Sequence, residues 1–260
     1  MAKSKIYFVS AGPGDIGLLT VKALEILKKS DAVFYAGSLI NPEMLKAAKK
    51  KALLIDMKSL NYGEIKERLL NMNGKFKIIS ILHAGDSSVY SSINEQAAYL
   101  EETGVEYEII PGVTAAFAAS AANKSVLTLP GVSQAVIICR GGGKTGGMPD
   151  GQDIKSLASH RATMAVYLSF AIMESVAGDL MEHYPENTPC LIAKDVSLDS
   201  ELIINCELKD VVKKAEKYSI KNKAVLIVGG ALTGKYVKEN RSKLYDEGFS
   251  HSFRDKKDGV

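Results

Sequence analysis

Short apolar runs alternate with longer amphipathic stretches along the first half of the chain. The apolar runs cover residues 5–11, 32–36, 53–56, 77–83 and 106–111. Their continuous, β-branched character is typical of parallel strands that are buried on both faces. The amphipathic stretches cover residues 18–30, 41–50, 63–74 and 93–104. This alternation predicts a parallel sheet with crossover helices.

A second series of the same kind fills the second half of the chain. Its predicted strands cover residues 135–139, 163–169, 189–193 and 223–230, and its predicted helices cover 171–184 and 208–218. A segment of small residues, "TAAFAASAANKS", separates the two series, and we place the domain boundary there. We therefore expect two α/β domains, residues 1–118 and 119–260, with no internal repeat.

Composition narrows the function classes. The 260 residues include 33 basic and 30 acidic side chains, and a net charge of +3 does not indicate nucleic-acid or membrane binding. No apolar run is long enough for a transmembrane helix, and the N-terminus lacks the apolar core of a signal peptide. Cys139, Cys190 and Cys206 are too far apart for a C-x-x-C pair, so reduced thiols and a cytoplasmic location are expected.

The loop after the first predicted strand imitates a dinucleotide-binding turn, because a G-x-G-x-x-G pattern starts at Gly12. Such a turn binds pyrophosphate through free backbone N–H groups and needs an acidic residue at the end of the next strand. Pro13 removes one N–H group, the next strand ends at Gly37, and Asp31 precedes that strand. The sequence favours a tight strand-to-helix turn over a nicotinamide site.

A second glycine-rich stretch, "CRGGGKTGGMPDG" at residues 139–151, imitates the end of a phosphate-binding P-loop at Lys144 and Thr145. Ile138 stands where the first glycine of a P-loop belongs, and glycine and proline follow where a helix should begin. We interpret this stretch as a loop that either closes over a ligand or is a solvated surface loop.

Two more loops follow predicted strands of the first half, "HAGDSSVY" and "PGVTAAF". Ligands of open α/β sheets bind beyond the carboxyl ends of the strands, so these loops and "AGPGD" could line one cleft. Their glycines and alanines would let a ligand approach the backbone, and Asp86 and Thr114 would orient it.

Several stretches together carry a family resemblance: "VSAGPGD", "GLLTVKALEILKKSDAVFYAGSLI", "LHAGDSSVY", "IIPGVTAAFAASAA" and "LTLPGVSQAVIICR". They resemble the tetrapyrrole methylases, which transfer methyl groups from S-adenosyl-L-methionine to ring carbons of vitamin B12 and sirohaem precursors. Four further stretches are similar to the branch that methylates carbon 11 of precorrin-4 or cobalt-precorrin-4: "YAGSLI", "TLPGVSQ", "MPDGQDIKSLASHRATMAVYLS" and "NRSKLYDEGFSHSFR".

The resemblance implies two α/β domains with a cofactor cleft between them, usually in a homodimer, and a tetrapyrrole polycarboxylate as substrate. The positions that match the family's cofactor contacts are Pro13, Ala84, Gly85, Asp86, Val89, Thr114, Ala115, Leu168 and Val196. The candidates for substrate binding are Ser38, Tyr90, Arg140, Lys144 and Arg161. Basic side chains could pair with the substrate's carboxylates or simply be solvated. No metal is expected.

Methyl transfer from a sulfonium to a ring carbon needs alignment and a dry cleft, and it needs no side-chain nucleophile. A base could still accept the proton lost from the macrocycle, and Asp15 and Asp86 are the candidates. Asp15 is equally suited to cap a helix N-terminus. His83 is interpreted as a core histidine at the end of a strand, and the other histidines lack the spacing of a metal site.

The chain departs from the family's pattern at two points. Ser87 follows Asp86 where related sequences usually carry proline, which predicts a less rigid turn, and "SLDS" stands where relatives carry Trp-Pro. Two other functions stay open. The small net charge argues against a methylase of the same family with a macromolecular substrate, and Pro13 argues against a nicotinamide-dependent oxidoreductase.

The final segment, residues 240–260, combines many charges with large apolar side chains, namely Leu244, Tyr245, Phe249 and Phe253. Disordered termini seldom keep so many of these. We expect them to pack on the second domain or on a partner subunit; the alternative is a solvated tail.

Overall fold

The computed structural model describes residues 4–142, 147–233, 242, 244 and 247–255. The chain forms two compact units, Met1–Ala118 with Asp195–Ser200, and Ala119–Lys194 with Glu201–Val260. The domain limits predicted from the sequence leave Asp195–Ser200 in the second domain. In the structure this segment belongs to the first unit, because Val196 and Leu198 lie against the loop at Gly14.

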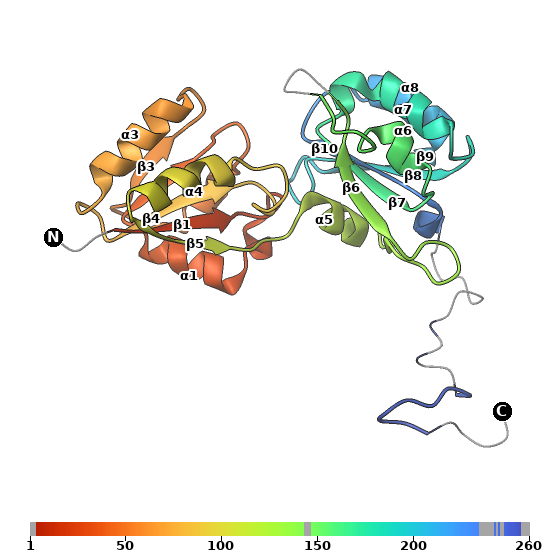
Figure 1. The fold of residues 1–260 in the computed structure, drawn as a ribbon, viewed down its shortest axis with the longest axis horizontal. Coiled ribbons are helices and arrows are strands. Elements are labelled where there is room, and N and C mark those ends of the chain that lie inside the picture. Colours follow the sequence, from red (N-terminus) through yellow and green to blue (C-terminus); the bar gives the residue numbers. More distant parts are fainter. Residues whose placement is uncertain (1–3, 143–146, 234–241, 243, 245–246, 256–260) are drawn as a thin grey trace. The chain divides into compact units, whose positions relative to one another are not determined.

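The first unit is built on a parallel sheet with the strand order β3-β2-β4-β1-β5 (Figure 1). Its strands are β1 (Lys5–Ser10), β2 (Ala32–Tyr35), β3 (Leu53–Asp56), β4 (Ile78–His83) and β5 (Glu106–Ile110). Each apolar run of the first half thus supplies one strand, as the pattern predicts.

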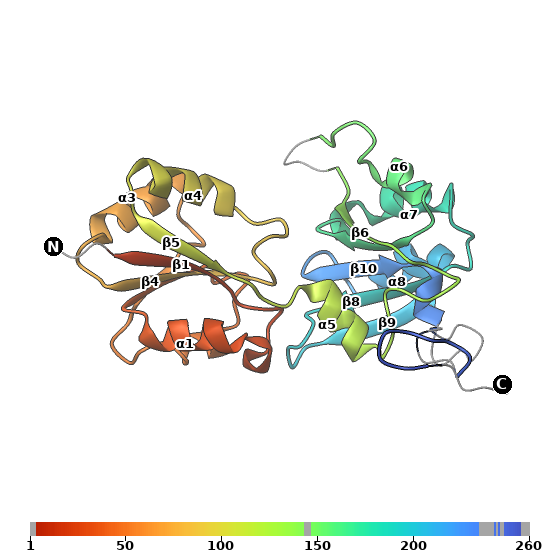
Figure 2. The same ribbon diagram turned by 60° about the horizontal axis from the view of Figure 1, so that its bottom comes forward.

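Helices cover both faces of this sheet: α1 (Val21–Lys29), α2 (Pro42–Leu45), α3 (Tyr62–Met72) and α4 (Ile93–Glu102). In both ribbon views α1 lies on one face, and α3 and α4 lie on the other (Figures 1 and 2). Side chains of a strand alternate between the two cores: Phe8 packs with Leu69 and Leu100 of α3 and α4, whereas Val9 packs with Leu27 of α1.

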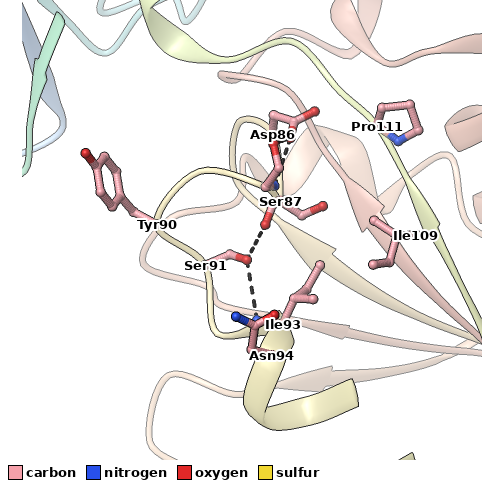
Figure 3. A pocket seen from close by; sticks show the side chains of 9 residues that line it. Asp86, Ser87, Tyr90, Ser91, Ile93, Asn94, Ile109 and Pro111 are labelled. Carbon is pink, nitrogen blue, oxygen red and sulfur yellow. Dashed lines mark hydrogen bonds between the residues drawn. The ribbon is translucent and has the colours of Figure 1, made fainter. Parts of the chain in front are cut away.

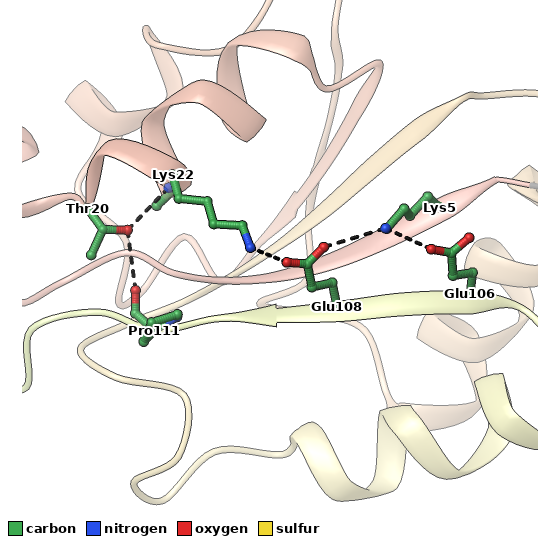
Figure 4. A network of polar contacts seen from close by, with 7 residues as sticks. Lys5, Thr20, Lys22, Glu106, Glu108 and Pro111 are labelled. Carbon is green, nitrogen blue, oxygen red and sulfur yellow. Dashed lines mark hydrogen bonds and ion pairs between the residues drawn. The ribbon is translucent and has the colours of Figure 1, made fainter.

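Local contacts fix where α1 begins and join it to the edge strand. The Thr20 side chain accepts the N–H of Ala23 and so caps the helix. The Thr20 hydroxyl also contacts the Pro111 carbonyl, and Lys22 pairs with Glu108 of β5 (Figure 4). A solvent-accessible ion pair contributes little stability, but with the cap and the Thr20 contact it holds the start of α1 beside the end of β5.

The second unit contains a mixed sheet with the order β6-β7-β10-β8-β9. Its strands are β6 (Val136–Arg140), β7 (Thr163–Tyr167), β8 (Pro189–Lys194), β9 (Leu202–Glu207) and β10 (Ala224–Val228). Only β6 and β7 pair in parallel within this described sheet; the other pairs are antiparallel. The sequence pattern does not predict β9, which pairs with β8 at the edge of this sheet as far as the structure describes it.

Helices α6 (Ile154–Ala158), α7 (Met173–Met181) and α8 (Val211–Lys217) lie on one side of this sheet (Figure 1). Their apolar side chains and those of the strands form one core cluster. The small-residue segment that marks the domain boundary forms a helix, α5 (Ala115–Ala122). This fits the high helix propensity of alanine.

Cys139, Cys190 and Cys206 are free thiols, and the first two are buried. No helix in the described ranges is long and apolar enough to span a membrane.

The described part of the C-terminal segment exposes its apolar side chains. Leu244 and Phe249 are 45% and 40% exposed, and Phe253 is 93% exposed. Tyr245 and Lys144 lie outside the described residues. The structure therefore does not bury Phe253 on the second unit, and packing on a partner subunit stays a prediction.

Truncation after Asn240 is expected to weaken dimerisation and turnover, whereas truncation after Arg254 should change neither. The shorter chain loses Phe249 and Phe253, and burying two phenylalanines at a subunit contact would contribute about 3–6 kcal/mol. Analytical ultracentrifugation and a methyl-transfer assay measure both effects. If both truncated chains match the full chain in melting temperature, dimerisation and turnover, the segment is a solvated tail.

Candidate active site

The candidate site starts from the carboxyl ends of two neighbouring strands, β1 and β4. The helices that follow them, α1 and α4, lie on opposite faces of the sheet (Figures 1 and 2). The loops after these strands therefore diverge, and this arrangement is where open α/β sheets bind ligands.

A pair of glycines joins these two loops. The N–H of Gly12 donates to the Gly85 carbonyl at 3.0 Å, and the N–H of Gly85 donates to the Gly12 carbonyl at 2.7 Å. Both residues have positive φ angles, +70° and +69°, which favour glycine. Because the Gly12 N–H donates to Gly85, it cannot bind a pyrophosphate. Pro13 has no N–H group, so a dinucleotide would find two backbone donors missing from this turn.

The loop after β5 closes onto the other two loops. The Oδ2 atom of Asp86 accepts the N–H of Gly112 at 2.8 Å, and its Oδ1 accepts the N–H of Ser88 at 2.8 Å. A Cβ atom on Gly112 would lie 2.6 Å from the Cβ of Ser10 and 2.8 Å from the carbonyl oxygen of Gly85. The three loops predicted to share a cleft are therefore in direct contact.

Hydrogen bonds control the charge of Asp86. Partial burial by itself would raise the pKa of this carboxyl. The N–H of Gly112, the Ser88 hydroxyl and the Ser88 N–H outweigh burial and lower the pKa below its ordinary value. Asp86 is therefore ionised at neutral pH and a weaker base than a free aspartate. Its three donors suit it to hold loops together.

The other candidate base, Asp15, is exposed and caps the short 3-10 helix Ile16–Leu18. Its Oδ1 accepts the N–H of Gly17 at 2.7 Å. This is the helix-capping role that the sequence analysis gave as the alternative to a catalytic base. The side-chain amide of Asn41 donates to the Gly14 carbonyl at 2.8 Å. This contact brings the loop after β2, which contains Ser38, to the same edge of the sheet.

A cavity of about 640 Å³ opens beside Asp86 in the first unit (Figure 3). It is lined by Asp86, Ser87, Ser88, Tyr90, Ser91, Ile93, Asn94, Ile109 and Pro111. Ile109 and Pro111 provide apolar surface, and serine and asparagine side chains provide hydrogen-bonding groups. Tyr90, a predicted substrate residue, is 43% exposed and has a φ of +53°. Such non-glycine residues cluster at functional sites.

The segment Asp195–Ser200 completes the site in the first unit. Val196 is buried, and its carbonyl oxygen would lie 3.3 Å from a Cβ on Gly14. The N–H of Asp15 donates to the Ser197 hydroxyl at 2.9 Å. The structure thus brings the candidate cofactor residue Val196 next to the loop that contains Pro13.

The predicted residues of the second unit are divided between the two ends of the parallel pair β6 and β7. Arg140 pairs in register with Tyr167, so it lies at the same end as Leu168. Arg161 precedes β7 and lies at the other end, roughly 15–20 Å away at 3.3 Å per residue. The structure therefore does not bring Arg161 together with Arg140. Leu168 is 72% exposed and has a φ of +54°, an unusual combination for a leucine.

His83 ends β4 directly before the glycine loop. Its ring packs against Phe8 with centroids 5.8 Å apart, and its Nε2 is buried without a hydrogen-bond partner. Burial disfavours the charged imidazolium and lowers the pKa of His83 to about 4. At neutral pH this side chain is uncharged, as expected of a core histidine.

The pKa of His83 predicts a loss of stability in mild acid. The unfolded chain binds a proton at the ordinary pKa of about 6.5, whereas the folded chain binds it near 4, so stability falls as the pH decreases through this window. The loss should approach about 3 kcal/mol, and His83→Leu should remove most of it. Urea unfolding from pH 7.5 to 4.5 measures this.

The family assignment follows from comparison with known proteins. A family model described as tetrapyrrole (corrin/porphyrin) methylases matches residues 5–212. The chain belongs to the tetrapyrrole methylases. This tetrapyrrole methylase is 41% identical over 251 residues to the cobalt-precorrin-4 C(11)-methyltransferase of Methanocaldococcus jannaschii, with 96% of each chain covered. It is 34% identical to the enzyme of the same name from Priestia megaterium, over 96% of this chain and 97% of the relative.

Solved structures agree with this assignment. The X-ray structure of a cobalamin biosynthetic enzyme, cobalt precorrin-4 methyltransferase, superposes with a TM-score of 0.84 at 32% identity and covers 88% of this methylase and 95% of its own chain. The native uroporphyrin III C-methyl transferase of Thermus thermophilus gives a TM-score of 0.75 at 26% identity, with 93% and 99% covered. The two-domain α/β architecture of the methylase is thereby confirmed.

Sequence reasoning missed two residues that shape the site of this methylase, Ser10 and Gly112. Gly112 lies inside the quoted motif "IIPGVTAAF", but its contact with Ser10 joins residues far apart in the sequence. Ser10 lies inside the quoted motif "VSAGPGD", but its contact with Ser87 likewise joins residues far apart in the sequence.

Proposed function

We propose that this methylase transfers the methyl group of S-adenosyl-L-methionine to carbon 11 of cobalt-precorrin-4, in vitamin B12 biosynthesis. The observation that carries the proposal is the similarity over nearly the whole chain to enzymes named for this reaction, at 41% and 34% identity. The structural match with a TM-score of 0.84 supports the same substrate.

The charges of the three joined loops fit this cofactor. Residues 10–15, 83–90 and 111–115 contain two acidic side chains, Asp15 and Asp86, and no lysine or arginine, and His83 is uncharged. A cofactor with a cationic sulfonium and no phosphate suits such loops, whereas a pyrophosphate would be repelled. Close packing of Gly85 and Gly112 leaves backbone rather than side chains at the edge, which lets a ligand approach closely.

The protein's part in the reaction is alignment. When bound, S-adenosyl-L-methionine supplies a methyl group that its sulfonium has already activated. The residues proposed to hold it in the first unit are Pro13, Ala84, Gly85, Asp86, Val89, Thr114, Ala115 and Val196. Asp86 would act by fixing these loops, because its oxygens already accept protein donors. The contact at Leu168 stays a prediction from the family's motif.

The substrate contacts form a separate part of the proposal. Ser38 and Tyr90 lie on loops at the carboxyl edge of the first unit, and Arg140 offers a guanidinium that suits the substrate's carboxylates. Arg140 and Arg161 lie at opposite ends of the parallel pair β6 and β7. We therefore propose Arg140, and not Arg161, as the partner of a substrate carboxylate. A homodimer and a cytoplasmic location are further parts of the proposal.

Turnover with defined substrates tests the function. The purified protein should convert cobalt-precorrin-4 and S-adenosyl-L-methionine into S-adenosylhomocysteine and a product with one added methyl group, which mass spectrometry detects. The matched reactions contain metal-free precorrin-4 and uroporphyrinogen III. Methylation of uroporphyrinogen III without methylation of either precorrin-4 form would overturn the proposal in favour of another ring carbon.

A binding measurement separates the cofactor from the substrate. S-adenosylhomocysteine should raise the melting temperature, since it binds the native state, and NAD should not. A shift with NAD alone would revive the oxidoreductase alternative.

A further inference from the structure

Two buried serines join the end of β1 to the loop after β4. Ser10 is fully buried and Ser87 is 4% exposed. The N–H of Ser87 donates to the Oγ of Ser10 at 2.9 Å, and the hydroxyl of Ser10 donates to the Oγ of Ser87 at 2.8 Å. The Ser10 hydroxyl is thus both acceptor and donor toward the same residue, which fixes Ser87 in place.

This pair changes the interpretation of Ser87. The sequence predicts a less rigid turn here, because proline is usual after Gly-Asp in related sequences. The structure shows instead that Ser87 is held by two hydrogen bonds to Ser10. A third hydrogen bond, which Figure 3 shows, runs from the Ser91 hydroxyl to the Ser87 carbonyl. Hydrogen bonds to Ser10 restrain the turn where a pyrrolidine ring would restrain it through φ.

Ser87 directly follows Asp86, whose carboxylate accepts the N–H of Gly112. Ser10 also touches the Gly112 loop, because a Cβ on Gly112 would lie 2.6 Å from the Ser10 Cβ. A change at Ser10 therefore reaches both loops that face the proposed cofactor site, although Ser10 itself is fully buried and meets no ligand.

We propose that Ser10 is a positioning residue for methyl transfer, which acts through Ser87 to hold Asp86 against Gly112. This inference rests on the proposed cofactor site. If it holds, the residues tolerated at positions 10 and 87 depend on each other. The N–H of Ser87 points at the Ser10 oxygen, so the Cδ of a proline at position 87 would occupy the space of that oxygen. Proline at 87 then requires a residue without this hydroxyl at 10, such as glycine.

A set of substitutions tests the pair. Ser10→Ala should raise the Kd for S-adenosylhomocysteine about tenfold, the effect of roughly one lost buried hydrogen bond. The KM for S-adenosyl-L-methionine should rise in parallel, with a smaller change in kcat. Ser87→Pro alone should weaken binding at least as much, and Ser10→Gly with Ser87→Pro should restore it to within about threefold.

A second serine pair of the same unit provides the control. Ser30 and Ser80 are also buried, and their Oγ atoms are 2.6 Å apart, but Ser30 follows α1 at the opposite edge of the sheet. Ser80→Ala should lower the unfolding free energy as Ser10→Ala does and leave the Kd unchanged. The inference is overturned if Ser10→Ala lowers the unfolding free energy without raising the Kd for S-adenosylhomocysteine. It is also overturned if Ser87→Pro, with Ser10 unchanged, binds S-adenosylhomocysteine with the Kd of the unaltered chain. Absence of S-adenosylhomocysteine binding by the unaltered chain would instead overturn the proposed function.

Discussion

Replacing Gly112 with alanine is expected to lower the affinity for S-adenosylhomocysteine by at least about tenfold and to destabilise the fold by about 1–3 kcal/mol. The new methyl group would lie 2.6 Å from the Ser10 Cβ, 2.8 Å from the Gly85 oxygen and 3.1 Å from the Ser10 oxygen. Two of these atoms are backbone, so no rotamer change relieves the clash. The loops must separate, which isothermal titration calorimetry and urea unfolding would detect.

Gly178 supplies the matched control for this substitution. It is exposed in the middle of α7, and a Cβ there would meet no atom within 4 Å. Gly178→Ala should therefore stabilise the protein by about 0.5–1 kcal/mol and leave cofactor affinity unchanged. Normal affinity in Gly112→Ala would contradict the close contact of the three loops.

Removal of the Asp86 carboxylate should have the second large effect. Asp86→Ala loses the bonds to Gly112 and Ser88 and should weaken S-adenosylhomocysteine binding about 10- to 100-fold, or about 1–3 kcal/mol. Asp86→Asn keeps one acceptor oxygen and turns an NH2 group toward a donor, so it should show an intermediate loss. Titration calorimetry of both variants measures the order.

A substitution of Asp153 serves as the control that separates a general loss of stability from a loss of loop geometry. Its carboxylate accepts the N–H and hydroxyl of Ser156, as that of Asp86 does with Ser88, but it caps α6 in the second unit. Asp153→Ala should cost about 1 kcal/mol of stability without changing the Kd. Equal affinity losses in the two alanine variants would refute a specific role for Asp86.

The lowered pKa of Asp86 adds a pH dependence. A carboxyl whose folded pKa is depressed contributes its full stability above its ordinary pKa of about 3.9, and loses this contribution as the pH falls through the folded value. The difference in unfolding free energy between the unaltered chain and Asp86→Ala should be constant near neutral pH and shrink in strong acid.

Strand prediction succeeded for each apolar run of the first half, including the partly exposed edge strands β3 and β5. Helices cover β1 and β4 on both faces, so their apolar sequences alone identify them as strands. β9 was missed because it lies at the edge of a sheet, buries only Ile204 of its six residues, and includes Asn205 and Cys206. α5 was read as a boundary because its alanines and serine carry no amphipathic pattern.

The candidate site could be predicted only in part. The glycine loops after β1, β4 and β5 follow from the rule that parallel strands end at one edge, and the structure places these loops in contact. The partners of Asp86 and the Ser10–Ser87 pair could not be predicted, because each joins segments far apart in the sequence. The contact of Asp195–Ser200 with the loop at Gly14 could not be predicted for the same reason.

That returning segment also constrains the order in which the chain can fold. A ribosome releases all five strands of the first unit long before it makes Val196 and Leu198, which lie against Gly14. Until then the first unit is a nascent intermediate with its Gly14 loop uncovered. A gene fragment that stops at Ala118 would encode the sheet without this cover, so the edge that carries the candidate site should mature only after synthesis has passed Ser200.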